Sequence, residues 1–368
     1  MKIPYVNIKK QYFIERRNLL SVIDKALLSG NWVGGSEIDK FEESISKICK
    51  TKYCVSLNSG TDALTLGLHL LGVRKGDEVI TPPNSFVAST AVIVHLGAKP
   101  VFVDINKDQN INVELIEKKI TKKTKAIMPV HLTGRMCEMD KINKISKKYN
   151  IPIIEDSAQS IMSSFKNKMS GSWGKIGCFS THPLKNLNAS GDGGFLTTND
   201  KKIYEIIKNL RSHGMEDDRN NVKSFGYVSR MDNLQAAILN YRLKNLKKII
   251  KSRRINVQNY IENLNFNHAK IPLETKDQFN TYHTFVIQVN QRDELKKYLE
   301  KNGIGTAIHY PVPIHLQKCS KLLGYKKGDF PETEKQSKRI LSLPINQFLR
   351  KQEIIYISNL INKFYKTR

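Results

Sequence analysis

The feature that most constrains the fold is a repeated alternation, over the first two-thirds of the chain, of short apolar runs with amphipathic stretches. Short strands that alternate with helices favour a mostly parallel sheet covered by helices on both faces. Sheets of this kind bind ligands at the carboxyl ends of their strands. We predict strands at 78–81, 100–104, 125–130 and 151–156, and helices at 61–71, 140–149 and 232–250.

The pattern changes after residue 250, where the elements become fewer and more widely spaced. A strand at 284–289, a helix at 292–301 and a turn at Gly303 indicate a smaller α+β unit. A chain of 368 residues is also longer than a single hydrophobic core usually supports. We therefore predict a large α/β domain over residues 1–250 and a small C-terminal α+β domain over residues 251–368.

Charge and cysteine content limit the classes of function. The formal net charge is +26, but the basic residues form scattered lysine pairs instead of one arm or stripe, which favours a lysine-rich surface over a nucleic-acid-binding face. No apolar stretch is long enough to span a membrane, and the N-terminus lacks the core of a signal peptide. The five cysteines form no CxxC pair and no metal-binding spacing with histidines. These features predict a cytoplasmic protein that binds no metal, nucleic acid or membrane.

The first polar motif that could carry chemistry is the segment 58–63, Asn-Ser-Gly-Thr-Asp-Ala, just before the predicted helix at 61–71. Backbone N–H groups and hydroxyls at a helix N-terminus attract anions, and the helix dipole adds to the attraction. The same residues also suit an ordinary helix cap. This motif alone leaves both interpretations open.

The second motif is the segment 153–159, in which the acidic residues Glu155 and Asp156 end a predicted strand. A carboxylate at that position lies where parallel sheets place their active sites. It could pair with a protonated pyridine nitrogen and make the ring an electron sink. Alternatively, Asp156 is the N-cap of a helix.

The third motif places a single lysine, Lys185, among Ser, Asn and Gly residues in the segment 177–194. Most other lysines of the chain lie in charged stretches. Burial lowers the pKa of a lysine and makes its amine a usable nucleophile for a Schiff base. The nearby glycines would let the backbone approach a cofactor closely. The alternative is a surface loop with a solvated lysine.

In this order, the three motifs closely resemble the DegT/DnrJ/StrS family of sugar aminotransferases, which share the fold-type I architecture of pyridoxal-phosphate (PLP) enzymes. The resemblance covers nearly the whole chain. It also includes the segments 76–82, 97–104, 130–134, 230–237, 309–315 and 341–344.

The resemblance implies a role for each residue at a matching position. Lys185 matches the lysine that forms a Schiff base with PLP, and Asp156 matches the partner of the pyridinium nitrogen. Gln159 matches the residue beside the ring hydroxyl, and Phe86 matches the aromatic side chain that stacks on the ring. The phosphate-binding positions of the family correspond to Gly60, Thr61 and Ser180.

The family's enzymes are similar in being homodimers with active sites at the interface, and the segment around Arg230 resembles the part that the neighbouring subunit supplies. The family usually has Asn where this chain has Val228. Valine cannot hydrogen-bond to a phosphate, so Arg230 or Ser229 is expected to replace that contact. Further departures, at Asn84, Ser85, Thr133 and Arg135, are expected near the cleft and suggest a different substrate.

These residues predict an aminotransferase. A subgroup of the family has histidine in place of the lysine and catalyses dehydration, so Lys185 favours transamination. The resemblance implies transfer of an amino group, with glutamate as donor, to a nucleotide-linked keto sugar in amino-sugar or surface-polysaccharide biosynthesis.

The segment 309–315 looks more like the enzymes that act at sugar carbon 3 than those that act at carbon 4. His309, Tyr310 and His315 are candidate substrate residues, or alternatively domain-packing residues. Two other functions stay open: a PLP-dependent sugar dehydratase, and a non-catalytic regulatory or DNA-binding protein on the same scaffold, to which the charge of +26 gives some weight.

Overall fold

This computed structural model describes residues 1–216 and 220–366. A central sheet of seven strands forms the middle of the N-terminal part. The hydrogen-bonded orders are β1-β9-β8-β5 and β3-β2-β4, and parallel bridges beyond β4 and β5 join the two groups. Every neighbouring pair is parallel except those of β9, which runs antiparallel to β1 and β8. The predicted, mostly parallel sheet is confirmed. The strands are β1 (Tyr53–Leu57), β2 (Glu78–Thr81), β3 (Lys99–Phe102), β4 (Thr124–Ile127), β5 (Ile154–Asp156), β8 (Ile176–Ser180) and β9 (Gly194–Thr198).

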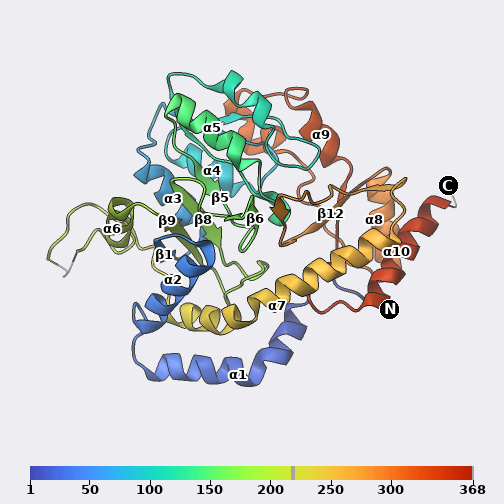
Figure 1. Cartoon of the computed structure of the whole chain (residues 1–368), viewed down its shortest axis with the longest axis horizontal. Coiled ribbons are helices and arrows are strands. Elements are labelled where there is room, and N and C mark those ends of the chain that lie inside the picture. The colour runs from blue at the N-terminus through green and yellow to red at the C-terminus, as the bar shows by residue number, and fades with distance from the viewer. Residues whose placement is uncertain (217–219, 367–368) are drawn as a thin grey trace.

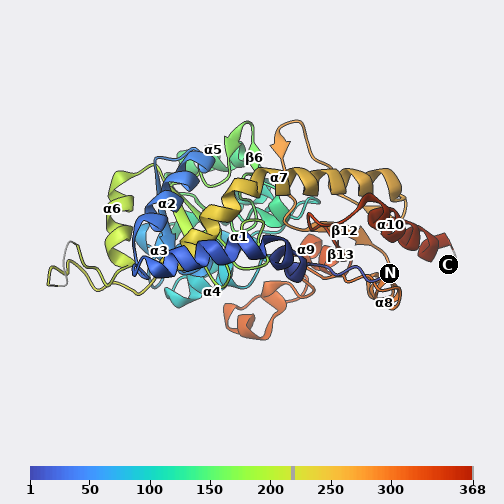
Figure 2. The same cartoon turned by 90° about the horizontal axis from the view of Figure 1, so that it is seen from below.

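Helices cover both faces of this sheet, as Figures 1 and 2 show. Helices α3, α4 and α6 share one buried cluster with the sheet, whereas α2, α5 and α7 belong to clusters on the opposite face. Helix α1 lies alongside α7 in both views. The helices are α1 (Ile8–Leu28), α2 (Ser36–Cys49), α3 (Gly60–Leu70), α4 (Ala88–His95), α5 (Met139–Tyr149), α6 (Lys201–Leu210) and α7 (Asn233–Asn263).

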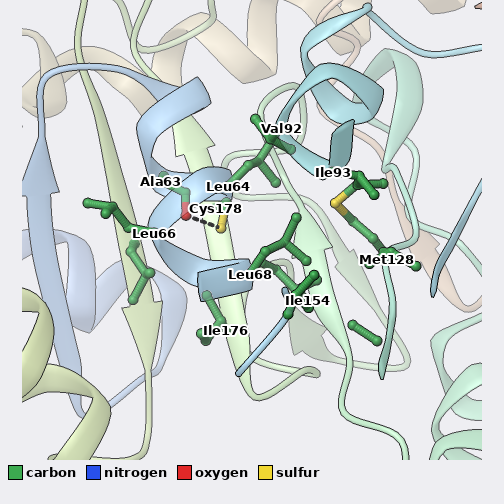
Figure 3. Packing of buried hydrophobic residues seen from close by; sticks show 14 of the residues in the cluster. Ala63, Leu64, Leu66, Leu68, Val92, Ile93, Met128, Ile154, Ile176 and Cys178 are labelled. Atoms are coloured by element: carbon green, nitrogen blue, oxygen red, sulfur yellow. Dashed lines mark hydrogen bonds between the residues drawn. The ribbon is translucent and has the colours of Figure 1, made fainter. Parts of the chain in front are cut away.

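The packing of α3 positions the functional end of the sheet (Figure 3). Leu64 and Leu68 of α3 are buried in one cluster with Ile154 of β5 and Cys178 of β8. The thiol of Cys178 lies 3.2 Å from the carbonyl oxygen of Ala63. Each buried leucine or isoleucine contributes about 1.5–3 kcal/mol relative to an exposed one. This face therefore holds the N-terminus of α3 beside the carboxyl ends of β5 and β8.

The C-terminal part has its own core around an antiparallel sheet in the order β10-β12-β13. Its buried cluster joins Phe285 of β12, Leu295 of α8 and Ile357 of α10, and it includes Ile3 from the start of the chain. The predicted strand at 284–289 and helix at 292–301 are confirmed. The elements are β10 (Ala269–Lys270), β12 (Phe285–Val289), α8 (Arg292–Lys301), α9 (Pro331–Ser337), β13 (Ile340–Leu343) and α10 (Lys351–Lys366).

Short elements complete the described chain. A small sheet has the order β11-β6-β7, with β6 at Ser164–Phe165, β7 at Lys168–Met169 and β11 at Gln278–Phe279. The 3-10 helices are η1 (Val113–Leu115), η2 (Glu117–Lys119), η3 (Leu132–Gly134), η4 (Ile314–Leu316) and η5 (Lys318–Leu323). No helix within residues 1–216 and 220–366 combines the length and apolarity needed to cross a membrane.

Helix α7 connects the two cores. It is 31 residues long and continues to Asn263, so the predicted end at 250 was wrong. Leu239 and Leu246 pack with α2, and Val257 and Tyr260 pack in the C-terminal core. The later turns were missed because their buried face includes polar residues such as Arg253. The predicted domain boundary falls inside this helix, and the division into two domains stays a prediction.

Candidate active site

A cavity of about 420 Å³ opens where the predicted site residues meet. Its walls come from the N-terminus of α3, the loop after β2, the segments after β5 and β8, and two segments of the C-terminal part. Because parallel strands end at the same edge of a sheet, residues far apart in sequence converge here. The predicted residues that line the cavity are Gly60, Thr61, Phe86, Asp156, Gln159, Ser180, Lys185, His309 and Tyr310.

The N-terminus of α3 forms one wall. The hydroxyl of Ser59 accepts a hydrogen bond of 3.0 Å from the N–H of Asp62 and caps the helix. A Cβ on Gly60 would lie only 2.7 Å from the Cβ of Ser180, so only glycine allows β8 to come this close. The first turn of a helix has free backbone donors. Ser180 therefore lies beside donors that suit an anionic group, and the helix cap at Ser59 is compatible with an anion at this position.

Asp156 is buried at the base of the cavity, with 4% of its surface exposed. The hydroxyl of Ser89 donates a 2.7 Å hydrogen bond to one carboxylate oxygen, and the N–H of Ala158 donates a 3.2 Å bond to the other. Asp156 ends β5. Its hydrogen bond from the N–H of Ala158 lies in a turn where no helix begins, so Asp156 does not cap a helix. Two donors fix the carboxylate while leaving it on the cavity wall.

Lys185 lies in the loop between β8 and β9. On its C-terminal side, Asn186 donates a 3.1 Å hydrogen bond to the carbonyl oxygen of Thr281, and Leu187 is buried in the core. Burial lowers the pKa of the Lys185 amine to about 8, and the nearby Asp156 carboxylate opposes this shift. The side chain is half-buried because part of it faces the cavity. About a tenth of the amine is therefore uncharged at pH 7, far more than for an ordinary lysine.

Gln159, Tyr310 and Phe86 form a connected wall. Gln159 accepts a 2.7 Å hydrogen bond from the N–H of Thr133, and its amide group lies 3.5 Å from the hydroxyl of Tyr310. Burial raises the pKa of Tyr310 to about 12, with a further contribution from Asp156. The rings of Tyr310 and Phe86 are 6.1 Å apart. Phe86 remains 57% exposed, so its ring is available to a ligand.

Two histidines complete the cavity. The ring of His309 hydrogen-bonds to the hydroxyl of Ser342 at 2.8 Å, and burial together with Lys185 lowers its pKa to about 4. His283 was not predicted from the sequence. Burial lowers its pKa well below the usual value, and the nearby charge of Lys185 lowers that pKa further. Its Nδ1 is buried with no hydrogen-bond partner in the described chain. Both rings are therefore neutral at pH 7.

Glu155, the neighbour of Asp156, is a second residue whose role the sequence did not reveal. Its side chain is fully buried and accepts hydrogen bonds of 2.7–2.9 Å from the N–H groups of Gly171, Trp173 and Gly174. The Nε2 of His131 lies 3.0 Å from the same carboxylate. Because the Nδ1 of His131 accepts from the N–H of Cys137, Nε2 is the donor to Glu155. The Glu155–His131 pair therefore fixes the backbone behind Asp156.

The segment expected to contact a neighbouring subunit lies outside the cavity lining. Val228 is 59% exposed. Ser229 is fully buried, and its hydroxyl donates a 2.6 Å hydrogen bond to Asp62 of the same chain. It therefore cannot replace the missing Asn contact. Arg230 is half-exposed and is the remaining candidate.

His315 does not line the cavity. It is buried, hydrogen-bonds to Glu334 at 3.1 Å and packs edge-on against Phe330. This environment favours the alternative role, packing between segments, over substrate contact. Asn84 and Arg135 also bond elsewhere, Asn84 to the carbonyl oxygen of Gln109 and Arg135 to those of Pro272 and Leu273. Neither is among the residues of the cavity wall.

Known proteins are similar to this chain in sequence over nearly its whole length. A dTDP-3-amino-3,6-dideoxy-alpha-D-galactopyranose transaminase of Aneurinibacillus thermoaerophilus is 38% identical over 98% of this chain and 99% of the relative. A pleiotropic regulatory protein of Geobacillus stearothermophilus is 36% identical over 100% and 99% of the two chains.

Solved structures are also similar to this chain in fold. The crystal structure of DesV from S. venezuelae, in complex with a ketimine intermediate, has a TM-score of 0.96, 32% identity and coverage of 99% and 98% of the two chains. A sugar aminotransferase from Streptococcus pneumoniae in its PLP form has a TM-score of 0.87, 28% identity and coverage of 94% and 96%. These matches confirm the predicted PLP-transferase fold.

A sequence model of the DegT/DnrJ/EryC1/StrS aminotransferase family matches residues 14–362, nearly the whole chain. This chain belongs to the DegT/DnrJ/EryC1/StrS aminotransferase family.

Proposed function

We propose that this chain uses PLP to transfer an amino group from glutamate to a nucleotide-linked keto sugar. The observation that carries the proposal is the convergence of Lys185 and Asp156 on one cavity, with the pKa of Lys185 lowered to about 8. A lysine of this kind can bind an aldehyde covalently. A regulatory or DNA-binding protein would have no need of this pair in one cavity.

The residues of the cavity fit PLP. The α3 N-terminus and Ser180 offer donors to a phosphate, and the glycine at position 60 lets Ser180 lie against that N-terminus. Asp156 would face the ring nitrogen, Phe86 the ring and Gln159 the ring hydroxyl. When bound, PLP supplies an electron sink for the carbon whose C–H bond breaks.

The side chains then have separate tasks. The amine of Lys185 can take a proton from the donor carbon and return it elsewhere, since its pKa of about 8 lies near the operating pH. Ser89 fixes the orientation of the Asp156 carboxylate by donating to one of its oxygens. The rings of His283 and His309 are neutral, so they add no positive charge to the cavity beside Lys185.

The nucleotide-linked sugar is proposed to enter beside Phe86, His309 and Tyr310, which lie on the cavity wall. Amination at carbon 3 is proposed because the segment 309–315 resembles carbon-3 enzymes and because the 38% identical relative is named a 3-amino-sugar transaminase. We also propose that the reaction serves amino-sugar or surface-polysaccharide biosynthesis in the cytoplasm, where the five free cysteines would stay reduced.

A panel of nucleotide-linked 3-keto and 4-keto sugars, incubated with PLP and glutamate, tests this function. We expect a 3-keto sugar to yield the amino sugar and 2-oxoglutarate in equal amounts. A 4-keto sugar as the better acceptor would overturn the carbon-3 assignment alone. Loss of a sugar hydroxyl without consumption of glutamate would instead show a dehydratase.

We also propose that the active unit is a homodimer. Several large apolar side chains of α1, of the segment that follows it and of the segment between α6 and α7 are exposed on the single chain, and exposed apolar surface of this kind is typical of interfaces. They are Phe13, Ile14, Leu28, Trp32, Val33, Phe225 and Val228. Arg230 follows this segment and would reach the cavity of the partner.

The name of the 36% identical relative, a pleiotropic regulatory protein, keeps a regulatory function as a second candidate. The two candidate functions predict different colours for the purified protein. A PLP enzyme is yellow when purified, and borohydride bleaches it. A colourless protein that gains no absorbance with added PLP would favour the regulatory function.

A further inference from the structure

The segment 228–230 is joined to the N-terminus of α3 through Ser229. The hydroxyl of Ser229 donates a 2.6 Å hydrogen bond to the carboxylate of Asp62, in the first turn of α3. The carbonyl oxygen of Ser229 accepts a 3.1 Å hydrogen bond from the N–H of Asn58, and its hydroxyl lies 3.4 Å from the side-chain oxygen of Asn58. Ser229 is fully buried. The two segments therefore form one hydrogen-bonded unit.

The backbone of this segment is also fixed on its other side. The N–H of Ser229 donates a 2.9 Å hydrogen bond to the carbonyl oxygen of Arg211, and Val228 forms an antiparallel bridge with Ser212. Successive side chains of an extended backbone point to opposite sides. Val228 is 59% exposed and Arg230 is half-exposed, whereas Ser229 has no exposed surface. The side chain of Ser229 therefore points inward to Asp62, and its two neighbours lie at the surface.

The negative charge of Asp62 does not itself favour an anion at this position. Gly60 and Thr61, the two residues before Asp62, line the cavity, and the free backbone donors of this turn are the ones proposed for a phosphate. A carboxylate in the same turn repels a phosphate, because like charges disfavour each other. Asp62 can still be favourable in two ways. It can stabilise the helix dipole, or it can act through its hydrogen bond with Ser229.

We propose that Asp62 is a positioning residue, which by binding Ser229 holds the loop 58–61 in the conformation whose backbone donors receive the cofactor's phosphate. The inference rests on the proposed place of that phosphate at the α3 N-terminus. Without this bond, the N–H of Asn58 is the remaining donor that ties the loop to Ser229. The backbone donors would then be ordered only when the ligand binds, which lowers affinity. The same bond holds Arg230 at the surface, where the proposed contact with a partner needs it.

Two ligands that differ only in the phosphate test this role. Pyridoxamine phosphate has no aldehyde, so it binds without a covalent link to Lys185, and pyridoxamine also lacks the phosphate. Titration of the cofactor-free protein gives the Kd of the first, and competition against it gives that of the second. The ratio of the two Kd values is the phosphate advantage. We expect Asp62→Ala and Ser229→Ala each to reduce it at least about tenfold, as for one hydrogen bond to a charged group. The double variant should lose no more, because both changes remove the same bond.

Asp62→Asn separates the hydrogen bond from the charge. The amide oxygen of asparagine can accept from Ser229, so this variant should keep the parent's phosphate advantage within about threefold. Thr121→Ala is the matched control, because Thr121 also donates a 2.6 Å hydrogen bond to a carboxylate, that of Glu78 at the amino end of β2. A loss in Asp62→Asn equal to that in Asp62→Ala would show that the charge acts and not the bond. An unchanged phosphate advantage in Asp62→Ala, or equal weakening of both ligands, would show that the bond only stabilises the fold. Each of these results overturns the proposal.

The titration needs no sugar, so it separates this inference from the proposed function. If Asp62→Ala loses the phosphate advantage but the parent aminates no keto sugar, the proposed function fails and the positioning role stands. If the parent aminates a keto sugar and Asp62→Ala keeps the phosphate advantage, this inference alone fails. Should Asp62→Ala not fold, Ser229→Ala, which removes a single oxygen atom, gives the same comparison.

Discussion

At the scale of single residues, the carboxylate of Asp156 gives the most explicit prediction. Opposite charges about 4 Å apart attract by about 4 kcal/mol at an effective dielectric constant near 20, which is an upper bound. Asp156→Asn removes the charge that keeps the cofactor's ring nitrogen protonated but keeps size and hydrogen bonding. We expect single-turnover donor conversion to slow by up to about a thousandfold, at about tenfold per 1.4 kcal/mol.

A purely structural role, in which the side chain of Asp156 only holds the N–H of Ala158, predicts a different result. Asparagine can accept that hydrogen bond about as well as aspartate, so the variant would then convert the donor within about threefold of the parent rate. Ser89→Ala is an informative companion. It removes one donor to Asp156 but not the carboxylate, and we expect a loss of about tenfold to a hundredfold, as for one hydrogen bond of about 1.5–3 kcal/mol to a charged group.

The lowered pKa of Lys185 predicts how stability depends on pH in the cofactor-free protein. Between the pKa of about 8 in the folded state and the ordinary 10.5, the unfolded state binds more protons, so stability rises with pH. Below pH 8 the folded state bears the full unfavourable term, at most about 3 kcal/mol. Lys185→Met should therefore be more stable than the parent at pH 7. By pH 9.5 the advantage should fall to less than half, measured by urea unfolding. An advantage independent of pH would contradict the lowered pKa.

Lys185, Asp156 and seven further residues were predicted from their match to the family's motif positions, and the nine meet at one cavity. Glu155 and His283 were missed. A buried carboxylate has the same sequence signal as an ordinary charged residue until the backbone groups that it bonds to are known. His315 shows the opposite error, since histidine beside a cavity segment and histidine in a core have the same sequence signal.

At the scale of elements, Glu155 predicts how the loop behind β5 is stabilised. Its carboxylate holds three backbone N–H groups and His131 together. Glu155→Ala leaves all four donors without a partner, and we expect a loss of about 3–5 kcal/mol in urea unfolding. Glu155→Gln should lose less, because one acceptor oxygen remains. A loss under about 1 kcal/mol for Glu155→Ala would show that the loop is held by other contacts.

The strands that were predicted share one property: each is an apolar run with clear boundaries, such as β2 at Glu78–Thr81. Strands β8 and β9 were not predicted, although they complete the site. Both contain glycine, serine or threonine at buried positions, for example Gly177 and Thr197, where the backbone of the loop at Gly171 approaches. A strand that contains polar and small residues is not recognised from its sequence when the residues that bury it lie far away in the chain.

At the scale of the whole molecule, the exposed apolar side chains of α1 predict a dimer. Phe13→Asp places a charge on that surface and should give a monomer, or at least a tenfold weaker dimer, in sedimentation. A surface substitution on α5, Lys144→Asp, is the control, since it should leave assembly unchanged. A fully active monomeric parent would contradict both the dimer and the shared site.

Assembly also tests Arg230. If it supplies a phosphate contact to the partner subunit, Arg230→Ala should release PLP at least about tenfold more readily than the parent in equilibrium dialysis. Val228→Ala is the control for a loss of bulk at the same loop. Equal retention of PLP in all three proteins would show that no residue at 228–230 replaces the missing Asn.

The central claim, that Lys185 binds PLP covalently, has a direct test. The protein is purified with PLP, reduced with borohydride, digested, and the labelled peptide is sequenced by mass spectrometry. We predict that the label lies on Lys185 alone, in spite of the many other lysines in the chain, because burial lowers the pKa of this amine to about 8. Lys185→Ala should carry no label. A label on another lysine, or the same labelling in Lys185→Ala, would contradict the account.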